Sequence, residues 1–363
     1  MHKKALLIPV LFFSALLYSQ PKINIIPQPV NLQLGDGAFL IEQNTAVIYN
    51  KKDNDLKAAA AFLLSHIKAI SGYYLPQNKK GSRSIELKME KNDALGKEGY
   101  TLNVTPTSIV LSANNKTGLV YAMQSLFQTL PVIRTNAPLE VPAMSITDYP
   151  RFPYRGMHLD VSRHFFSPEV VREFIDLMAI YKFNTFHWHL TDDQGWRIEI
   201  KKYPKLTSVG AWRVDRTDKP WELRERAKPG EKPTYGGYYT KEQIKDIVAY
   251  ASERNITIIP EIEMPGHAEA AIAAYPFLSC IKQPQFVITG GQYPKEYQTN
   301  FCAGNDSIFV FLENVLTEIM ELFPSQYIHI GGDEVDKASW KTCKNCQQRM
   351  KDHNLKNVDE LQS

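Results

Sequence analysis

The sequence has little of several features that mark common classes of protein. It contains only four cysteines in 363 residues, and its formal net charge of +3 is small for that length. It has no block of Lys and Arg residues and no glycine-rich loop of the type that holds phosphate. These absences argue against a polyanionic partner such as a nucleic acid. A hydrophobic content of 44% and a charged content of 22% are ordinary for a globular protein.

The apolar stretch at the N-terminus is too short for an ordinary membrane span. It runs from Ala5 to Leu17, follows two lysines and precedes Ser19-Gln20. This arrangement is typical of a secretory signal peptide. We therefore predict a signal peptide at residues 1–20, with an uncleaved anchor as the alternative, and a periplasmic or secreted protein that has left the membrane after cleavage. No cysteine lies near the cleavage region, so a lipoprotein anchor is not indicated.

The few cysteines all lie in the last part of the chain. Cys280 and Cys302 flank a loop-like stretch rich in Pro, Gly and Gln, and Cys343 and Cys346 form a CxxC motif. Export implies an oxidising compartment, in which thiols pair. A structural zinc ion would need both pairs as ligands, so disulfide bonds are the favoured interpretation. Spacing does not define their connectivity.

Residues 21–148 show a mixed pattern, which predicts a small N-terminal α+β domain. Short segments rich in β-branched residues predict strands, and two amphipathic stretches predict helices. Prolines from Pro138 to Pro153 are interpreted as a linker that follows. The predicted strands are 46–49, 85–89, 100–104 and 108–112, and the predicted helices are 56–71 and 117–130.

From Tyr154 onward, strands and helices alternate regularly. Ser167-Pro168 is typical of a helix start, as N-cap and first-turn proline, and Thr240 with Gln243 forms a capping box for another helix. Such alternation favours parallel βα units. The predicted strands are 157–161, 183–190, 256–262 and 326–330, and the predicted helices begin near 167, 240 and 307.

Ionisable residues follow each of these four predicted strands. The carboxyl ends of the strands form the active face of a (β/α)8 barrel, whereas an open doubly wound sheet uses strand ends only near its switch point. The pattern therefore favours a TIM barrel over residues 149–363. Only about four βα units are visible, so we expect its N-terminal half only, truncated near Ser363. The polar groups are Ser162-Arg163-His164, His187 to His189 with Asp192-Asp193, Glu261 with Glu263 and His267, and Asp333-Glu334.

The segment YIHIGGDEV, residues 327–335, ends in two adjacent carboxylates. A solvated turn is the ordinary interpretation of such a pair. This pair, however, follows a strand that reads as buried, and Gly331 and Gly332 would let a ligand approach closely. Paired carboxylates in a cleft suit glycoside hydrolysis, in which one of them moves a proton. Because an anion disfavours ionisation of its neighbour, Glu334 is the better acid beside Asp333.

Other residues near the predicted strand ends have two interpretations each. Arg163 is either a surface arginine or a forked donor to hydroxyl groups. His267 either begins a helix or orients the acid. Together with His189 and Asp192 it also suggests a metal centre, but no HExxH helix arrangement supports one, and His187 and His189 lie on one face of a strand. We predict no metal and no cofactor.

Four motifs together resemble glycoside hydrolase family 20, the β-N-acetylhexosaminidases. They are RGMHLDVSRHF (155–165), FNTFHWHLTDDQGWR (183–197), IIPEIEMPGH (258–267) and YIHIGGDEV (327–335). Their order matches, and the resemblance covers most of residues 21–363. It implies a TIM barrel preceded by a small α+β domain. It also implies a retaining mechanism in which the 2-acetamido group of the sugar is the nucleophile and forms an oxazolinium intermediate.

The resemblance also implies a role for individual residues. Glu334 would be the general acid and then the base for water, and Asp333 would orient the acetamide N–H. Arg163 would bind hydroxyls of the terminal sugar, and Asp192 and His267 would tune Glu334. The aromatic wall and the tyrosine with which the family binds the acetamide come from later strands and have no counterpart in these residues.

The expected function is release of terminal, non-reducing β-linked N-acetylglucosamine or N-acetylgalactosamine from an oligosaccharide or glycoconjugate. Three alternatives stay open: a non-catalytic carbohydrate-binding protein on the same scaffold, a metal-dependent hydrolase, and an inactive fragment of the enzyme. The acid pair argues against the first, because binding alone does not require an acid. The expected partner is the glycan itself, with no nucleic acid and no membrane.

Overall fold

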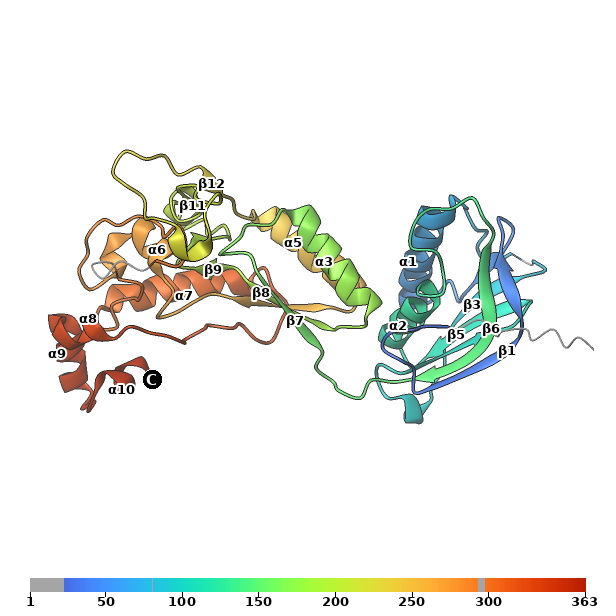
Figure 1. The fold of residues 1–363 in the computed structure, drawn as a ribbon. Helices are drawn as coiled ribbons and strands as arrows, with labels where there is room; N and C mark the ends of the chain where they lie inside the picture. Colours follow the sequence, from blue (N-terminus) through green and yellow to red (C-terminus); the bar gives the residue numbers. More distant parts are fainter. Residues whose placement is uncertain (1–22, 80, 293–297) are drawn as a thin grey trace, which may run out of the picture.

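The computed structural model describes residues 23–79, 81–292 and 298–363, and its elements form two parts (Figure 1). Each part has its own hydrophobic core, one drawn from residues between Ile25 and Ile146 and the other from residues between Val161 and Cys346. No helix in the described ranges is long and apolar enough to cross a membrane. The predicted signal peptide, residues 1–20, lies outside them.

The first part is a six-stranded mixed sheet with two helices packed on one face (Figure 1). The strand order is β1-β6-β4-β5-β3-β2. Helix α1 begins after Asp53, whose carboxylate accepts backbone hydrogen bonds, and ends at Gly72 in the left-handed region. The elements are β1 (Asn31–Ile41), β2 (Ala46–Ile48), α1 (Asn54–Ser71), β3 (Ser84–Met89), η1 (Asp93–Leu95), β4 (Tyr100–Val104), β5 (Ser108–Ala113), α2 (Lys116–Phe127) and β6 (Leu139–Asp148).

The predicted strands and helices of this part are confirmed, but the predicted linker is wrong in its first half. Residues 139–148 form β6, which lies between β1 and β4. Pro142 obscured this strand, since proline donates no ladder hydrogen bond. It pairs with Ala38 beside an irregularity in β1, and the pairing with β4 ends at Met144. Proline is tolerated where the ladder is already interrupted.

The second part alternates strands and helices, as predicted. Its three-stranded parallel sheet has the order β13-β8-β7. Ser167 precedes α3 and the Thr240–Gln243 capping box begins α5, so both helix starts are confirmed. The bounds are β7 (Gly156–Asp160), α3 (Pro168–Ile180), β8 (Thr185–His189), α5 (Lys241–Glu253), β13 (Thr257–Glu261) and α7 (Asp306–Met320).

The fourth predicted strand, residues 326–330, is present only as a single bridge. His329 pairs in parallel with Glu261, and its backbone exchanges hydrogen bonds with Pro260 and Ile262 at 3.0 Å. The prediction of a regular strand is therefore wrong. Tyr327 and Ile330 remain 69% and 49% exposed. The segment pairs on one side only among the described residues, and an edge without a second partner is weakly held.

The remaining elements are short and lie in the connections. Between β8 and α5 the chain forms β9 (Thr191–Asp192), β10 (Gly195–Trp196), α4 (Lys205–Ser208), β11 (Trp212–Arg213), η2 (Trp221–Leu223) and β12 (Tyr235–Gly236). After β13 come α6 (Glu269–Ala274) and η3 (Pro276–Leu278), and after His329 come α8 (Ala338–Thr342), α9 (Lys344–Asp352) and α10 (Val358–Gln362). Long connections at the carboxyl ends of strands are where barrel proteins carry their sites.

Two cations tie the two parts together. The Arg155 guanidinium donates to both carboxylate oxygens of Glu98, at 2.9 and 3.2 Å, and to the Tyr121 hydroxyl at 3.0 Å. Lys182 is buried and donates to Asp148 at 3.0 Å and to the Tyr100 hydroxyl at 2.8 Å. Glu98, Tyr121, Asp148 and Tyr100 all belong to the first part, so these contacts fix its position on the second.

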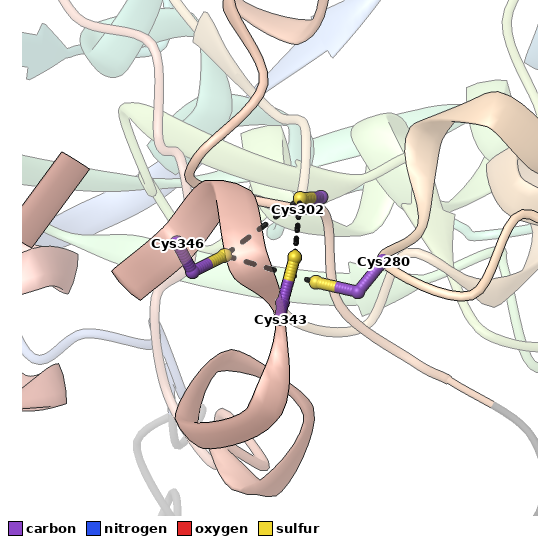
Figure 2. A group of neighbouring side chains, drawn as sticks. All are labelled: Cys280, Cys302, Cys343 and Cys346. Atoms are coloured by element: carbon purple, nitrogen blue, oxygen red, sulfur yellow. Dashed lines mark hydrogen bonds between the residues drawn. The ribbon is translucent and has the colours of Figure 1, made fainter. Parts of the chain in front are cut away.

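The prediction of disulfide bonds is also wrong. All four cysteines are free thiols. Cys280 lies 3.8 Å from Cys346, and Cys302 lies 3.7 Å from both Cys343 and Cys346, measured between sulfurs. A disulfide bond has a sulfur–sulfur distance of about 2.05 Å. The four cysteines instead meet as one cluster (Figure 2).

Candidate active site

The strand register places several polar side chains in one row. Asp160, His189 and Glu261 are direct neighbours at the carboxyl ends of β7, β8 and β13, and His329 extends the row beyond Glu261. Parallel strands in register bring side chains that lie far apart in sequence to the same edge of the sheet. The row forms the floor of a polar site above the hydrophobic core.

Asp192 is the buried centre of this site. It follows β8 and accepts a hydrogen bond from His189 Nε2 at 2.9 Å. The Arg163 guanidinium lies 2.7 Å from the same carboxylate oxygen, and His267 Nδ1 lies 3.3 Å from the other. Burial alone would raise the pKa of Asp192, but the hydrogen bonds from His189 and His267 and the Arg163 charge outweigh it and lower the pKa to about 2. Asp192 is therefore a fixed anion.

Arg163 is held in place by three acceptors. Its guanidinium donates to Asp160 at 3.0 Å and to the Gln194 amide oxygen at 3.1 Å, besides its contact with Asp192. Asp160 also accepts the Arg163 backbone N–H at 3.0 Å, which tightens the turn after β7. A planar guanidinium fixed by several acceptors has little freedom to reorient. Arg163 is thus a preorganised cation beside the site.

His267 connects the buried centre to the exposed acid pair. Its backbone has φ 48, in the left-handed region, which is uncommon for a residue other than glycine. Nδ1 donates to Asp193 at 3.1 Å, and Nε2 lies 3.8 Å from Asp333 and 3.6 Å from Glu334. The hydrogen bonds to Asp192 and Asp193 raise the pKa of His267 to about 11. His267 is therefore a cation that faces both carboxylates of the pair.

Asp333 and Glu334 lie together in an irregular segment after the His329 bridge. Their side chains are 68% and 81% exposed, so solvent reaches both. Glu334 has φ 50, and Gly331 and Gly332 also have positive φ, so three of four consecutive residues have left-handed or related backbone conformations. This backbone turns both carboxylates toward His267. Such conformations persist where the surrounding structure imposes them, often at functional sites.

One reason for the first glycine differs from the expected one. A Cβ atom at Gly331 would overlap the carboxylate of Glu263, so the glycine makes room for a neighbouring acid rather than for a ligand. The space at Gly332 is open, since a Cβ there would meet only the Met264 carbonyl at 3.9 Å. Glycine at 332 is needed for its φ of 107.

Sequence reasoning assigned no role to the acid that lies beneath the site, Glu261. His187 Nε2 and His189 Nδ1 lie 2.6 and 2.8 Å from its Oε2, and His329 Nδ1 lies 2.8 Å from its Oε1. The hydrogen bonds from His187 and His189 outweigh the effect of burial and hold the pKa of Glu261 well below its usual range. The available signal was the His187 and His189 spacing, which places both rings on one face.

Two other acids, Asp193 and Glu263, were also left without a role. Asp193 accepts the first backbone N–H of α6, from Glu269, at 3.0 Å, besides its bond from His267. Glu263 has a buried Oε2 without a hydrogen-bond partner among the described residues, and burial together with the Glu261 charge raises its pKa to about 8. Glu263 is therefore largely neutral at neutral pH. The adjacent Asp192-Asp193 pair in the sequence was the signal for the first of them.

The structure brings together all five residues that the sequence singled out. Asp192 contacts Arg163 and His267, and His267 in turn faces Asp333 and Glu334. Several of these groups lie close enough to surround a cation, including His267 with the acid pair. Burial lowers the pKa of His189, but hydrogen bonds to Asp192 and Glu261 raise it to about 10. Because His189 and His267 are protonated at these pKa values, they act as hydrogen-bond donors to the acids.

The arrangement can bind a polar ligand and transfer a proton. Arg163 and Asp192 offer a charged donor and acceptor at the carboxyl end of β7 and β8. A protonated His267 stabilises anionic carboxylates next to it, so it can support the charge that remains when one of them gives up a proton. General acid–base chemistry needs this combination of an accessible carboxyl group and a fixed charged neighbour.

Comparison with known proteins identifies the same two parts. Residues 152–363 match the sequence profile of glycosyl hydrolase family 20, catalytic domain, and residues 22–149 match that of glycosyl hydrolase family 20, domain 2. A beta-hexosaminidase of Porphyromonas gingivalis is 42% identical over 358 residues, with 94% of this chain and 42% of that protein covered. A beta-hexosaminidase of Vibrio furnissii is 39% identical, covering 94% of this chain and 53% of that protein.

Solved structures show the same likeness. A Vibrio harveyi exo beta-N-acetylglucosaminidase in complex with N-acetylglucosamine has a TM-score of 0.77 at 36% identity. The match covers 93% of this chain and 51% of that protein. A beta-N-acetylhexosaminidase of Bacteroides fragilis has a TM-score of 0.74 at 35% identity, and the match covers 93% of this chain and 62% of that protein. The chain spans about half the length of the curated relatives it matches. The predicted fold class, a barrel preceded by a small α+β domain, is confirmed, and the chain belongs to glycosyl hydrolase family 20.

Proposed function

We propose that the protein containing this chain is an exo-acting, retaining β-N-acetylhexosaminidase. Its substrates would be glycans that end in β-linked N-acetylglucosamine or N-acetylgalactosamine. The observation that carries the proposal is the chain of contacts from Arg163 through Asp192 and His267 to Asp333 and Glu334. It unites a hydroxyl-binding cation, a fixed anion and an accessible acid pair in one place.

Each residue has a role that fits its surroundings. Glu334 donates its proton to the glycosidic oxygen as the bond to the anomeric carbon breaks. Asp333 accepts the acetamide N–H and stabilises the positive charge that develops on that group. The positive charge of His267 stabilises the anionic forms of the two carboxylates, and Asp192 fixes the orientation of His267. Arg163 donates to hydroxyl groups of the terminal sugar ring.

The nucleophile in this proposal is the substrate itself. The carbonyl oxygen of the 2-acetamido group attacks the anomeric carbon as the leaving group departs, and an oxazolinium ion forms. Glu334 is then a carboxylate and removes a proton from a water molecule. The water oxygen attacks the anomeric carbon and opens the oxazolinium ring, so that the acetamido group is restored. Two inversions give net retention. The proposal agrees with the adjacency of Asp333 and Glu334, because a carboxylate nucleophile would have to lie about 5 Å from the acid across the scissile bond.

We also propose that the protein works outside the cytoplasm, in the periplasm or after secretion. The support is the basic start and short apolar run at residues 1–20. Peptide mapping of the protein isolated from culture fractions tests this point. A mature N-terminus near residue 21 is expected, and recovery of the intact leader in the cytoplasm would contradict it.

The experiment that tests the proposed activity compares two substrates that differ in one group. The full-length protein is expected to hydrolyse para-nitrophenyl N-acetyl-β-D-glucosaminide and to leave para-nitrophenyl β-D-glucoside, which lacks the acetamido group, essentially untouched. Proton NMR of the first product is expected to show the β-anomer before mutarotation. Equal hydrolysis of both substrates, or an initial α-anomer, would contradict the substrate-assisted mechanism.

A further inference from the structure

The four cysteines meet from three separate segments of the chain (Figure 2). Cys280 follows η3, and Cys302 lies in the connection before α7. Cys343 is the N-cap of α9, and Cys346 lies in the first turn of that helix. Their sulfur atoms all lie within 4.8 Å of one another. Such a convergence brings together residues as much as 66 positions apart.

Three of the sulfur–sulfur distances have the value that a single metal ion requires. They are 3.8 Å from Cys280 to Cys346 and 3.7 Å from Cys302 to both Cys343 and Cys346. A tetrahedral zinc ion with zinc–sulfur bonds of about 2.3 Å separates its ligands by about 3.8 Å, the edge of the tetrahedron. Disulfide bonding would instead require about 2.05 Å. Cys302 is also equidistant from Cys343 and Cys346, as a tetrahedron demands and as pairing with one of them does not.

The surroundings favour a bound cation as well. Cys302 and Cys346 are fully buried. A divalent ion that binds cysteine side chains displaces their thiol protons, so all four residues can become ligands.

Gly304 allows the segment that carries Cys302 to approach the start of α9, which carries Cys346. A Cβ atom at this position would overlap the backbone of Asn345 and Cys346. Its backbone N–H also donates to the Cys302 sulfur. Backbone donors to ligating sulfurs support metal sites from outside the ligand shell. The glycine and the cysteines thus form one built site.

We propose that Cys280, Cys302, Cys343 and Cys346 bind one structural zinc ion as four thiolates. Soft sulfur ligands in a tetrahedral set select zinc among the common divalent ions. With all four positions filled by protein, the site has no open position for substrate or water, so its role is structural rather than chemical. The proposal does not depend on the proposed hydrolase activity.

The position of the cluster indicates what the ion stabilises. The Phe301 backbone N–H donates to the Pro265 carbonyl at 2.8 Å, two residues before His267, and its own carbonyl accepts Trp340 Nε1 at 2.9 Å. The segment next to Cys302 thus lies between the loop of His267 and the segment that follows Asp333 and Glu334. Cys343 is nine residues after Glu334. A zinc ion bound by the cysteines would therefore hold the segment that follows Asp333 and Glu334 against the rest of the second part.

The direct test measures metal and thiols in the full-length protein. The protein is purified from the periplasm of an expression host without added metal or chelator, and zinc is measured by inductively coupled plasma mass spectrometry. About one zinc ion per chain is expected, with four alkylatable thiols after denaturation. Two disulfides and no zinc would overturn the proposal, as would one iron ion in place of zinc. Zinc found only after cytoplasmic expression would also overturn it for an exported protein.

Variants and a spectroscopic probe keep the test independent of folding. Cys302→Ser is expected to lose zinc, whereas Thr342→Ala, an exposed neighbour of Cys343, is expected to retain it. If Cys302→Ser fails to fold, cobalt exchanged into the unaltered protein answers the same question. Tetrahedral cobalt bound by four thiolates gives intense visible bands, and octahedral or absent cobalt would contradict the ligand set. Normal turnover by a zinc-free protein would leave the hydrolase assignment intact while overturning this inference.

Discussion

The two halves of the site are held in very different ways. Asp192 is buried and bound by Arg163, His189 and His267 at distances between 2.7 and 3.3 Å. Asp333 and Glu334 are exposed, and the contacts of their side chains with the rest of the described chain are those to His267 at 3.8 and 3.6 Å. The first half is a satisfied network of charges, and the second is an accessible pair beside it.

The difference follows from where the backbone places each half. Asp192 and Arg163 follow strands that pair with regular neighbours, so their positions are set by the ladder. The acid pair follows a segment that pairs at His329 only and then takes up positive-φ conformations. A buried network has to be complete because unpaired charges there are costly. An acid that exchanges protons with a substrate needs access instead.

The largest effect is expected when the accessible acid is removed. Glu334→Gln keeps the shape of the side chain but eliminates the proton, so kcat on the para-nitrophenyl N-acetylglucosaminide should fall roughly 10²- to 10⁴-fold. Steady-state kinetics of the full-length protein measure it. Glu321→Gln, an exposed glutamate at the end of α7, is the matched control and should retain full activity. Full activity of Glu334→Gln would remove the residue from the proposed role.

Removal of the buried anion should cost stability as well as activity. Asp192→Asn leaves Arg163, His189 and His267 without their shared counter-charge, and breaking a buried ion pair in this way costs about 3–5 kcal/mol. Urea unfolding of the full-length protein measures it, with the exposed Asp352→Asn as control. A midpoint for Asp192→Asn equal to that of the control would show that the network contributes little to folding.

The pH dependence of stability should follow the buried half. His189 and His267 have pKa values raised to about 10 and 11, so their contribution is complete below the unfolded pKa of about 6.5 and is lost as the pH rises through the folded values. Asp192, with a pKa lowered to about 2, contributes above about pH 3.9 and loses its contribution as the pH falls toward 2.

Stability from this network should therefore be greatest between about pH 4 and pH 6.5 and decline on the alkaline side by at most about 1.4 kcal/mol per pH unit for each histidine. Urea midpoints at several pH values measure the slope. His267→Gln should flatten the alkaline decline, because the residue that binds the extra proton is gone. An equally steep decline in that variant would assign it to other groups.

The smallest effect is expected for stability when the exposed aspartate is changed. Asp333→Asn removes a charge that solvent already reaches, so its unfolding free energy should change by no more than about 0.5 kcal/mol. Its activity should nevertheless fall strongly, because the acetamide group loses its anionic partner. The combination of unchanged unfolding and lost turnover separates this half from Asp192. A large loss of stability would mean that the pair also has a structural role.

Local patterns in the sequence were sufficient for most helices and strands. The Thr240–Gln243 capping box defines a helix start by hydrogen bonds within one turn, and Ser167-Pro168 marks another by its extended N-cap and first-turn proline. Both signals can be recognised without tertiary context. Strand β6 could not be predicted from the sequence, because a proline such as Pro142 fits within a strand only where the partner strand, here β1, is irregular. The prediction of a regular strand at 326–330 was wrong, because an apolar run does not reveal whether a second strand pairs with it.

The residues of the candidate site could be predicted from the sequence to a similar extent. Motif order implied Arg163, Asp192, His267, Asp333 and Glu334, and the structure places them in contact. Glu261 was missed as the acceptor of three histidines because its partners come from β8 and from the segment after α7. The cysteines show the same limit, since two pairs in the sequence do not reveal that they form one cluster.

The sequence by itself determined the family, the alternation of strands and helices, and the residue types of the acid pair. These depend on local hydrogen bonding, side-chain periodicity and motifs within short segments. Tertiary structure alone decided that Gly331 makes room for Glu263, that Asp192 has three cationic partners, and that four sulfurs lie within 4.8 Å of one another. Each depends on segments brought together by strand register and loop packing, because charges, protons and metal ions respond to distance in space.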